Sequence, residues 1–511
     1  MSLKSLFPKT LIDWLCLAFG VSLLPFLYYF LNYHLHLITY PYPLEFRESA
    51  MILTTHLLVQ GQNPFDLAHF PQATNSYGIF YSLVVYPFAK IWGPTLQVHR
   101  LFTGIFILAS CLVMVCVLRK NNAPPALSWA GGLLLYPVLL YPTTTTPVAG
   151  PHSLGLFLFL LSVYIPFFLN YSWASLLISL ICGLLAFYTK MYFVLGIPII
   201  CVYLLMLRSP KKAFILGAAF LLILLVSAIA VNHYMICYFN DTFYTQFQGA
   251  NAFDGGMKHS NAQMKEFYRI HHPLFYLLGI SMVVCLFGWK KNYKNFSFKY
   301  GGNLNLFSLF IATLVIYFMM GRSNGQWMAY LFQLMSPFFI LCVLNAASHQ
   351  KFLVFLSMPF ILFALMGLKH DLSNNPYSSD DNWITMRQLV AANMNILNSP
   401  LIVPFLIEYQ RHVYDSGQSQ FAIVGCGRQH LNTKLFPFQP EIAARFTDYA
   451  QQIHAMIREK KFDMLILTAP SFNSPWSPAD TNLYYRQIET FRVRLLHSDE
   501  VLDMVVSVPR D

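Results

Sequence analysis

Acidic residues are scarce over most of this chain. Only seven of its 22 acidic residues fall within the first 370 positions, and the other fifteen lie from Asp371 onward. Charged residues of both signs make up 11% of the sequence, whereas 56% of it is hydrophobic. This composition excludes an ordinary soluble domain and is typical of a polytopic membrane protein with a smaller polar remainder.

The nine cysteines show no CxxC pair and no Cys/His spacing of the kind that binds a metal. Several lie inside apolar runs, as Cys111 and Cys182 do. We therefore expect neither a disulfide framework nor a metal site, and no motif implies a cofactor. The net charge of +11 does not indicate nucleic-acid binding, because the basic residues gather in short clusters between apolar runs, where the inner surface of a membrane favours them.

A helix that crosses a bilayer needs about 20 predominantly apolar residues. The apolar run 78–92 is too short to cross the bilayer, and Pro87 and Lys90 interrupt it. It predicts an interfacial helix on the outer surface of the membrane. The first apolar run follows Lys4 and Lys9 and is long enough to remain as an anchor. About eleven stretches are candidate spans: 11–31, 100–118, 126–142, 152–169, 173–188, 191–207, 212–232, 273–289, 304–320, 327–345 and 350–368.

The charges between these spans predict the orientation of the chain. Loops such as 119–125 and 208–211 carry clustered basic residues, whereas the alternate loops carry the acids. By the positive-inside rule the N-terminus is inside, and the long loops 32–99 and 233–272 are outside. Because the number of spans is odd, everything past residue 370 also lies outside. We expect an integral protein of a bacterial inner (plasma) membrane with an extracytoplasmic active site.

A change of composition after residue 370 predicts two domains. Residues 1–370 form a transmembrane α-helical domain, and residues 371–511 form a small C-terminal extracytoplasmic α/β domain of ordinary size. The expected elements of the second domain follow from its apolar periodicity. They are strands at 421–426, 463–468 and 502–508 and amphipathic helices at 441–461 and 481–497.

The first outer loop holds three of the seven early acids, namely Glu45, Glu48 and Asp66. Its content of Pro, Gly, Asn and Tyr is that of a shaped loop. A membrane enzyme that needs a carboxylate base has few other candidates. The alternative interpretation is that acids in the first turn of a helix only complement the helix dipole, and that Asp66 belongs to an Asn-Pro-Phe-Asp turn.

Four stretches together resemble, in their order, the GT-C superfamily of glycosyltransferases, which includes the protein O-mannosyltransferases and the lipid A aminoarabinose transferase. The resemblance covers most of residues 1–368. It implies a GT-C-like bundle and transfer of a sugar from a polyprenyl-phosphate donor, within membrane lipids, to an extracytoplasmic acceptor that is a glycan, a lipid or a protein. The stretches are ESAMILTTHLLVQGQNP (48–64), YGIFYSLVVYPFAKIWGPTLQVHRLFTGIF (77–106), YTKMYFVLGIPI (188–199) and GRSNGQWMAYLFQLMSPFFIL (321–341).

Relatives in this superfamily commonly carry Asp-Glu in the first loop, with a catalytic Asp, whereas the matching pair here is Arg47-Glu48. Another acid, Glu45, lies close by. Glu45 and Glu48 are therefore both candidates for the base that takes the proton of the acceptor hydroxyl. The register counted back from Gly61 slightly favours Glu48.

The departing phosphate gains negative charge, so cationic donors must hold it. Lys190 lies between two spans with no acid nearby in sequence, and ionisable groups at such depth tend to mark function. Snorkelling of the amine to the interface is the alternative. The candidate substrate-binding residues are Arg47, Asp66, Tyr77, Arg100, His152, Lys190, Arg322 and Tyr330.

Two other functions compete with a glycosyltransferase. A transporter or flippase of lipid-linked glycans would tend to place ionisable groups near the bilayer midplane and to show repeated halves. Here the acids crowd one outer loop, and no internal repeat is visible. A noncatalytic scaffold that displays the outer domain would leave the shaped first loop and Lys190 unexplained.

Overall fold

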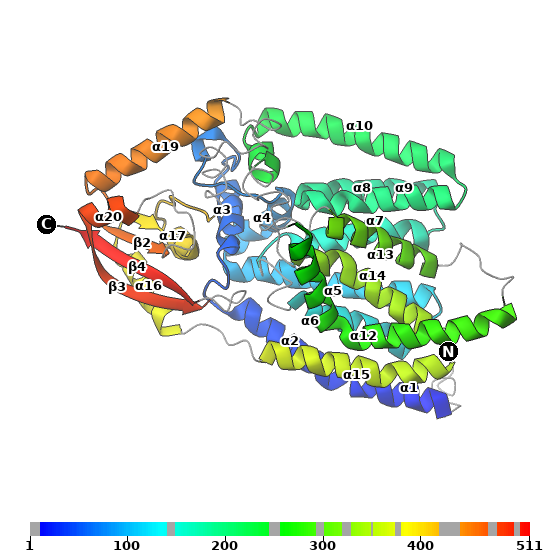
Figure 1. The fold of residues 1–511 in the computed structure, drawn as a ribbon. Helices are drawn as coiled ribbons and strands as arrows, with labels where there is room; N and C mark the ends of the chain where they lie inside the picture. The colour runs from blue at the N-terminus through cyan, green and yellow to red at the C-terminus, as the bar shows by residue number, and fades with distance from the viewer. Residues whose placement is uncertain are drawn as a thin grey trace.

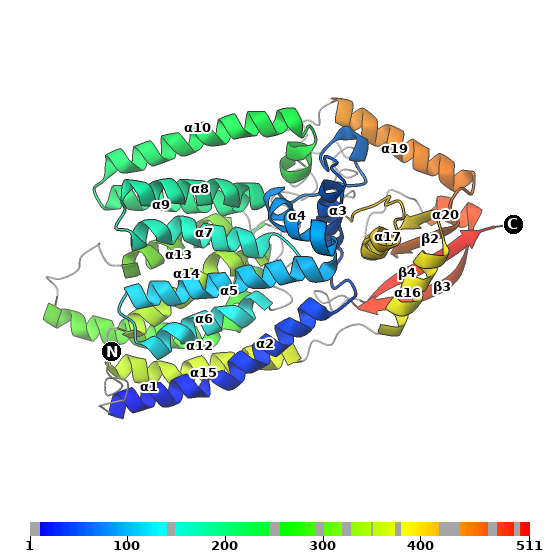
Figure 2. The same cartoon turned by 180° about the vertical axis from the view of Figure 1, so that it is seen from behind.

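The computed structural model describes residues 11–140, 149–244, 256–292, 301–318, 329–348, 351–373, 380–417, 440–468, 478–494 and 501–510. A large bundle of helices carries a small domain with a sheet at one end (Figures 1 and 2). The bundle helices run mostly along one direction, and the sheet lies beyond their ends. The helical bundle and the small C-terminal sheet agree with the fold class expected from the sequence, while the domain boundary at residue 370 stays a prediction.

Apolar runs form the bundle helices, and proline, glycine or polar residues mark many of their ends. The bounds are α1 Leu11–Ser22, α2 Leu24–Thr39, α5 Leu96–Lys120, α6 Pro125–Leu140, α7 His152–Phe168, α8 Trp173–Thr189, η3 Met191–Leu195, α9 Gly196–Met206, α10 Pro210–Tyr234, α12 Gly256–Asn292, α13 Gly301–Phe318, α14 Ala329–Ser348 and α15 Lys351–Ser373. Each of the eleven predicted spans overlaps one of these helices or, for the first, the α1–α2 pair.

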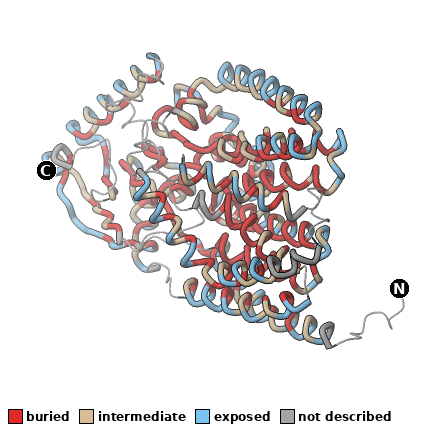
Figure 3. Tube along the Cα trace, turned by 45° about the vertical axis from the view of Figure 1, so that its right-hand side comes forward, coloured by how far each residue is buried: buried red, intermediate tan, exposed pale blue. Residues whose placement is uncertain are grey.

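Within the described residues, four stretches are long and apolar enough to cross a membrane, namely Trp14–Thr39, Leu96–Lys120, Pro210–Tyr234 and Lys351–Ser373, and six further apolar helices are shorter. The interior of the bundle is buried, while its outer helices expose much of their surface (Figure 3). On α10 that exposed surface is apolar, with Leu221, Leu225 and Ile229 each at least 60% exposed. Such a surface fits hydrocarbon, so the chain is an integral membrane protein; the number of crossings stays a prediction.

The outer loop expected at 233–272 is shorter than predicted. Residues Asn240–Tyr244 form a single π-helical turn, η4, and residues 256–272 already belong to α12. His271, expected in a solvated loop, is buried, and its Nε2 atom lies 2.8 Å from Ser336 Oγ of α14. The helix starts early because it has a buried apolar face at helical spacing, made by Phe267, Ile270, Leu274 and Leu277.

The stretch expected to lie on the outer surface forms α4, Phe80–Trp92, two residues shorter at its start than predicted. One face of α4 is buried through Tyr81 and Val85, whereas Ile91 and Trp92 at its end are 74% and 58% exposed. Gly93 ends the helix with a φ of 83°, a conformation that favours glycine. An apolar exposed face beside a buried one is what an interfacial helix requires.

The C-terminal domain has a four-stranded sheet in the order β1-β2-β4-β3. β1 and β2 are parallel, with Leu397 opposite Leu465, and β4 is antiparallel to both of its neighbours. Helices and strands alternate irregularly along the chain. Their bounds are α16 Asp380–Ala392, β1 Ile396–Asn398, η7 Pro400–Ile402, α17 Val403–Glu408, α19 Pro440–Arg458, β2 Met464–Thr468, α20 Pro478–Tyr484, β3 Tyr485–Arg494 and β4 Val501–Pro509.

The prediction of one helix over 481–497 is wrong. Of the residues described in this range, those up to Tyr484 belong to α20, and β3 follows as an edge strand. Phe491 and Val493 are buried while Arg492 between them is exposed, which is a strand period, and β4 supplies the backbone partners. The predictions for β2, β4 and α19 are confirmed within a few residues. The strand expected at 421–426 lies outside the described residues.

The C-terminal domain packs directly on the first outer loop. Ser49 Oγ of α3, Arg47–Val59, donates to Pro400 O at 2.6 Å. The rings of Tyr42 and Trp383 are stacked at 12° with centroids 6.1 Å apart. Ser416 donates from its backbone to Gln72 O at 2.9 Å and from its hydroxyl to Thr74 O at 2.8 Å. The loop is therefore held between the bundle and the C-terminal domain.

Candidate functional site

Glu48, in the first turn of α3, is fully engaged by its neighbours. Its Oε1 accepts from Arg100 Nε at 2.9 Å, and its Oε2 accepts from Arg100 Nη2 at 2.7 Å and from Leu44 N at 2.9 Å. Both side chains of the ion pair have no exposed surface. A bidentate pair of this kind fixes geometry as well as charge.

Arg100 uses its remaining donors on the backbone that leads into the loop. Nη1 donates to Tyr40 O at 2.6 Å and to Leu37 O at 3.3 Å, and Nη2 donates to Tyr42 O at 2.9 Å. With the two bonds to Glu48, all five N–H donors of the guanidinium are taken. The sequence predicted that Arg100 binds substrate, but in this arrangement it ties the end of α2, the loop and α3 to α5.

Glu45 is the less constrained of the two candidate bases. It is 1% exposed, and its Oε1 accepts a hydrogen bond from Arg47 Nε. Its Oε2 is buried without a hydrogen-bond partner among the described residues. Burial raises the pKa of Glu45 to about 7; the charge and hydrogen bonds of Arg47 lower it, and the charge of Glu48 raises it. A carboxyl group that titrates near neutral pH and has one open oxygen suits a general base.

Lys190 occupies a break between helices. α8 ends at Thr189, and Lys190 is extended, with φ −160° and ψ 129°, before η3 begins at Met191. Its side chain is buried, and Nζ lies 3.0 Å from His152 Nε2. The amine also lies 4.5 Å from the centroid of the Tyr77 ring. Three residues that the sequence predicted separately, Tyr77, His152 and Lys190, are thus brought together.

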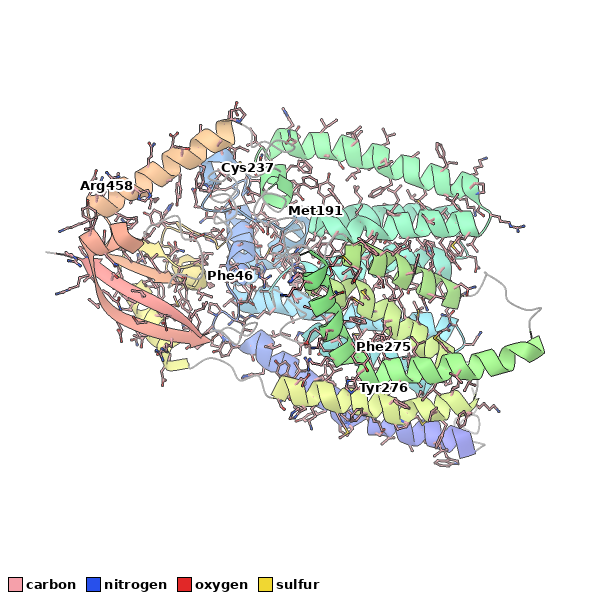
Figure 4. All side chains as sticks on the ribbon, viewed as in Figure 1. Phe46, Met191, Cys237, Phe275, Tyr276 and Arg458 are labelled. Atoms are coloured by element: carbon pink, nitrogen blue, oxygen red, sulfur yellow. The ribbon has the colours of Figure 1, made fainter. Side chains whose placement is uncertain are left out.

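The Lys190 cluster and the Glu45–Arg47 pair belong to one electrostatic site. Burial lowers the pKa of Lys190 well below its usual range, the positive charge of Arg47 lowers it further, and Glu45 raises it. Phe46 and Met191, the chain neighbours of these groups, lie at the end of the bundle that faces the C-terminal sheet (Figure 4). An anion bound here would favour the charged form of Lys190 and would balance the charge that this form adds beside the Glu45–Arg47 pair.

A glycine allows the first loop to reach Lys190. Gly78 N donates to Thr189 O at 3.0 Å. A Cβ atom at Gly78 would overlap the carbonyl of Tyr188, which is backbone and has no room to yield. The absence of a side chain therefore lets Tyr77 approach the end of α8.

The structure adds two uncharged residues to the site. Tyr192 has its ring centroid 5.3 Å from Lys190 Nζ, and its hydroxyl donates to Gln333 Oε1 at 2.9 Å. Both residues fall inside stretches that resemble the GT-C superfamily, at 188–199 and 321–341. As uncharged residues in apolar surroundings they gave no signal of their own in the sequence.

A further buried acid, Asp241, lies near the first loop. Asp241 Oδ2 accepts from Asn75 N at 3.4 Å, and burial raises the pKa of Asp241 well above its usual range. Asn75 Nδ2 in turn donates to Thr54 Oγ1 of α3 at 2.7 Å. The neighbouring Thr242 lines a cavity of about 10 Å³ beside Lys190, so the described side chains close tightly around the amine.

Among the remaining predicted residues, only Asp66 has a described side chain, and it does not join this cluster. Asp66 is exposed and precedes the short helix η2, Leu67–His69, after a turn in which its N–H donates to Asn63 O at 3.2 Å. Arg322 lies outside the described residues, and Tyr330 is in α14, with a side chain outside the described part. Where the structure is described, no group of three His, Cys, Asp or Glu residues could hold a metal.

No family model matches the sequence, and no curated protein matches it. The structure does match two crystal structures of ArnT from Cupriavidus metallidurans. The one bound to undecaprenyl phosphate has a TM-score of 0.52 and 10% identity, over 95% of this chain and 98% of ArnT. The chain has a GT-C-like fold. The apo form of ArnT gives 0.53 and 11%, over 95% and 97% of the two chains. The GT-C resemblance seen in the sequence is thereby confirmed for the fold.

Proposed function

We propose that this chain is an integral-membrane glycosyltransferase that moves a sugar from a polyprenyl-phosphate donor to an extracytoplasmic acceptor. The observation that carries the proposal is the electrostatic proximity of Glu45 to Lys190. One oxygen of the Glu45 carboxylate is buried without a hydrogen-bond partner among the described residues. The likeness to an ArnT structure bound to undecaprenyl phosphate supports the class of donor. The open alternatives for the acceptor are a surface glycan, a lipid and a protein.

In the proposed reaction Glu45 is the base. Its carboxylate takes the proton of the acceptor hydroxyl as that oxygen attacks the anomeric carbon of the sugar. The bond between the anomeric carbon and the phosphate oxygen breaks, and the electron pair leaves with the polyprenyl phosphate. A single displacement inverts the anomeric centre. A phosphate is already a weakly basic leaving group, so no protein acid is needed.

Lys190, His152 and Arg47 are the proposed donors to the departing phosphate. Negative charge develops there, and preorganised cations in a buried site stabilise it. The phosphate also stabilises the charged form of Lys190, whose pKa is lowered by burial without it. Because the cavity beside the amine is only about 10 Å³, donor binding requires neighbouring side chains to rearrange.

Glu48 and Arg100 are proposed to position this site without touching the substrates. Glu45 lies three residues before Glu48, and the buried pair fixes the start of α3 against α5. This proposal reverses the slight preference for Glu48 as base that followed from the register counted back from Gly61. In the proposal the carboxylate with an unoccupied oxygen reacts, and the one held by Arg100 and Leu44 does not.

The experiment that tests this function measures cleavage of the bond between the sugar and the polyprenyl phosphate. The purified protein is incubated with a polyprenyl-phosphate donor carrying a radiolabelled sugar and with membrane extract as the source of acceptor. We expect the label to move to the acceptor and free polyprenyl phosphate to appear, and we expect Glu45→Gln to bind donor without either event. Movement of intact donor across a vesicle membrane with no bond cleavage would instead establish the transporter.

A further inference from the structure

A polar groove lies between the C-terminal domain and the start of α5, apart from the proposed catalytic site. Its volume is about 760 Å³, within the ~300–1,000 Å³ range of small-molecule sites. One wall is residues 93–97, which are the turn between α4 and α5 and the first two residues of α5. α16 and α17, with Arg411 just beyond, form the other, and the C-terminal end of α3 closes the groove through His56 and Gln60.

The groove carries an excess of positive charge. Its charged side chains are Arg387, Glu408 and Arg411, which sum to +1. Arg387 and Glu408 form an ion pair. Among the described residues Arg411 bonds to neutral groups, including Ala391 O at 3.0 Å from Nη2, and its buried Nε has no partner there.

The N-terminus of α5 adds to this field. Thr95 caps the helix, accepting from Val98 N at 3.4 Å, and the groove is lined by Leu96 and Gln97 of the first turn. The N–H groups of a first helical turn are not used inside the helix, and the dipole makes this end positive. The charged side chains and this helix end therefore favour an anion in the same groove.

From Leu101 onward, toward its C-terminal end, α5 exposes a continuous apolar stripe. Leu101 follows Gln97 by one helical turn, and Leu101, Ile105, Leu108 and Leu112 are between 40% and 51% exposed. Their spacing of three and four residues places them on one face of the helix. Ile91 and Trp92, at the end of the interfacial helix α4, expose further apolar surface near the same turn. A ligand with a charged head and apolar tails matches this arrangement.

We propose that the groove binds the phosphate headgroup of an anionic phospholipid of the outer leaflet, with its acyl chains along the α5 stripe. Arg411 and the first turn of α5 hold the phosphate. The net positive charge selects an anionic headgroup over a zwitterionic one. This site is independent of the glycosyltransferase proposal, because it shares no substrate with the Glu45–Lys190 cluster.

The test measures lipid binding to the full-length protein in detergent by native mass spectrometry. The probes are phosphatidylglycerol and phosphatidylcholine of equal chain length, and glycerophosphoglycerol, which lacks the acyl chains. We expect phosphatidylglycerol to bind at least tenfold more tightly than the other two, and Arg411→Gln to lower its affinity by tenfold or more. Arg458→Gln is the matched control, because Arg458 ends α19 at the far corner of the domain (Figure 4).

The outcomes separate the lipid from other ligands. Equal binding of the two phospholipids, or an unchanged affinity in Arg411→Gln, overturns the proposal. Equally tight binding of glycerophosphoglycerol shows a site for a soluble phosphate ester and also overturns it. Ile105→Ser tests the stripe without touching the charges, and we expect it to weaken phosphatidylglycerol severalfold. Melting temperatures within a few degrees of the parent protein show that each variant is folded.

Discussion

Arg100 and Glu48 form an ion pair at 2.7 Å in which neither side chain has any exposed surface. The pair lies one turn from Glu45, whose carboxylate keeps a buried oxygen without a partner among the described residues. Two acids three residues apart in the sequence thus have opposite surroundings. Glu48 is held by the opposite charge of Arg100. Glu45 has a pKa of about 7.

Substitution of each acid by glutamine should separate the two roles. Glu45→Gln keeps the size and loses the base, so we expect the transfer rate to fall by ~10²–10⁴ with donor binding and melting temperature retained. Glu48→Gln leaves Arg100 buried without its counter-charge, and loss of one partner of a buried pair costs about 3–5 kcal/mol of stability. Transfer rates and thermal melting in detergent measure both effects. Near wild-type transfer in Glu45→Gln would refute its role as base.

The transfer rate should depend on pH through Glu45. Only the deprotonated carboxylate accepts a proton, so with a pKa of about 7 in the free enzyme we expect kcat/KM for the donor to rise about tenfold per pH unit below neutrality and to level off above it. Arg47 lowers this pKa, so Arg47→Gln should move the rise to higher pH. Arg119→Gln, at the opposite end of α5, should leave the profile unchanged. A rise centred near the ordinary glutamate pKa would contradict the assignment.

Lys190 should matter for donor affinity. A lost charge-assisted hydrogen bond to phosphate is worth roughly 1.5–3 kcal/mol, or about ten- to a hundredfold in binding. We expect Lys190→Met to weaken donor binding by that factor, measured with a fluorescent polyprenyl-phosphate sugar, and Lys190→Arg to restore part of it. Lys212→Met removes a lysine that bonds only to Tyr171 O among described residues, and it should bind donor normally. If Lys190→Met and Lys212→Met bound the donor with equal affinity, the alternative that the Lys190 amine snorkels to the interface would be the better account.

Gly78→Ala should disable the site without removing any functional group. The added methyl group would overlap the Tyr188 carbonyl and push the first loop away from α8. We therefore expect weaker donor binding and slower transfer, together with a lower melting temperature. Gly279→Ala in α12 is the matched control, since nothing lies within 4 Å of its added Cβ atom. If the two alanine variants behaved alike, close approach of the loop to α8 would not be required.

The orientation of the chain is open to a direct test. Glu459 is exposed at the end of α19, and a cysteine introduced there should react with an impermeant thiol reagent on spheroplasts if the C-terminal domain is extracytoplasmic. Labelling is compared with the parent protein, which carries its own cysteines. Reaction only after permeabilisation would place the domain inside and change the number of membrane crossings.

The helical bundle was predictable because hydrophobic runs of span length have few alternatives to a membrane helix. The start of α12 before residue 273 was not predictable. His271 and the polar residues around it in the sequence indicate a solvated loop, and the buried face of this segment is evident only from its packing against α14. β3 was mistaken for a helix for a similar reason. Its alternation of buried Phe491 and Val493 is short, and a bulge after Gln487 breaks its period.

The candidate site was predictable as a set of residues but not as a set of roles. Charge scarcity directed attention to Glu45, Glu48 and Lys190, since few ionisable groups were available. The partner of each one lies far away in the chain, as Arg100 does for Glu48 at a separation of 52 residues. Register favoured Glu48, and only the three-dimensional partners show that its oxygens are already occupied.

Ser49 and Pro400 are joined by a hydrogen bond across 351 residues of sequence. α3 emerges early in synthesis, but the carbonyl that receives its hydroxyl is made only after the whole bundle has been inserted. A chain that stops before Pro400 therefore lacks this contact, although the Arg100–Glu48 pair that fixes the start of α3 is already complete. The segment that carries the proposed base is thus held twice, first by a contact made within the bundle and then by one made with the last third of the chain.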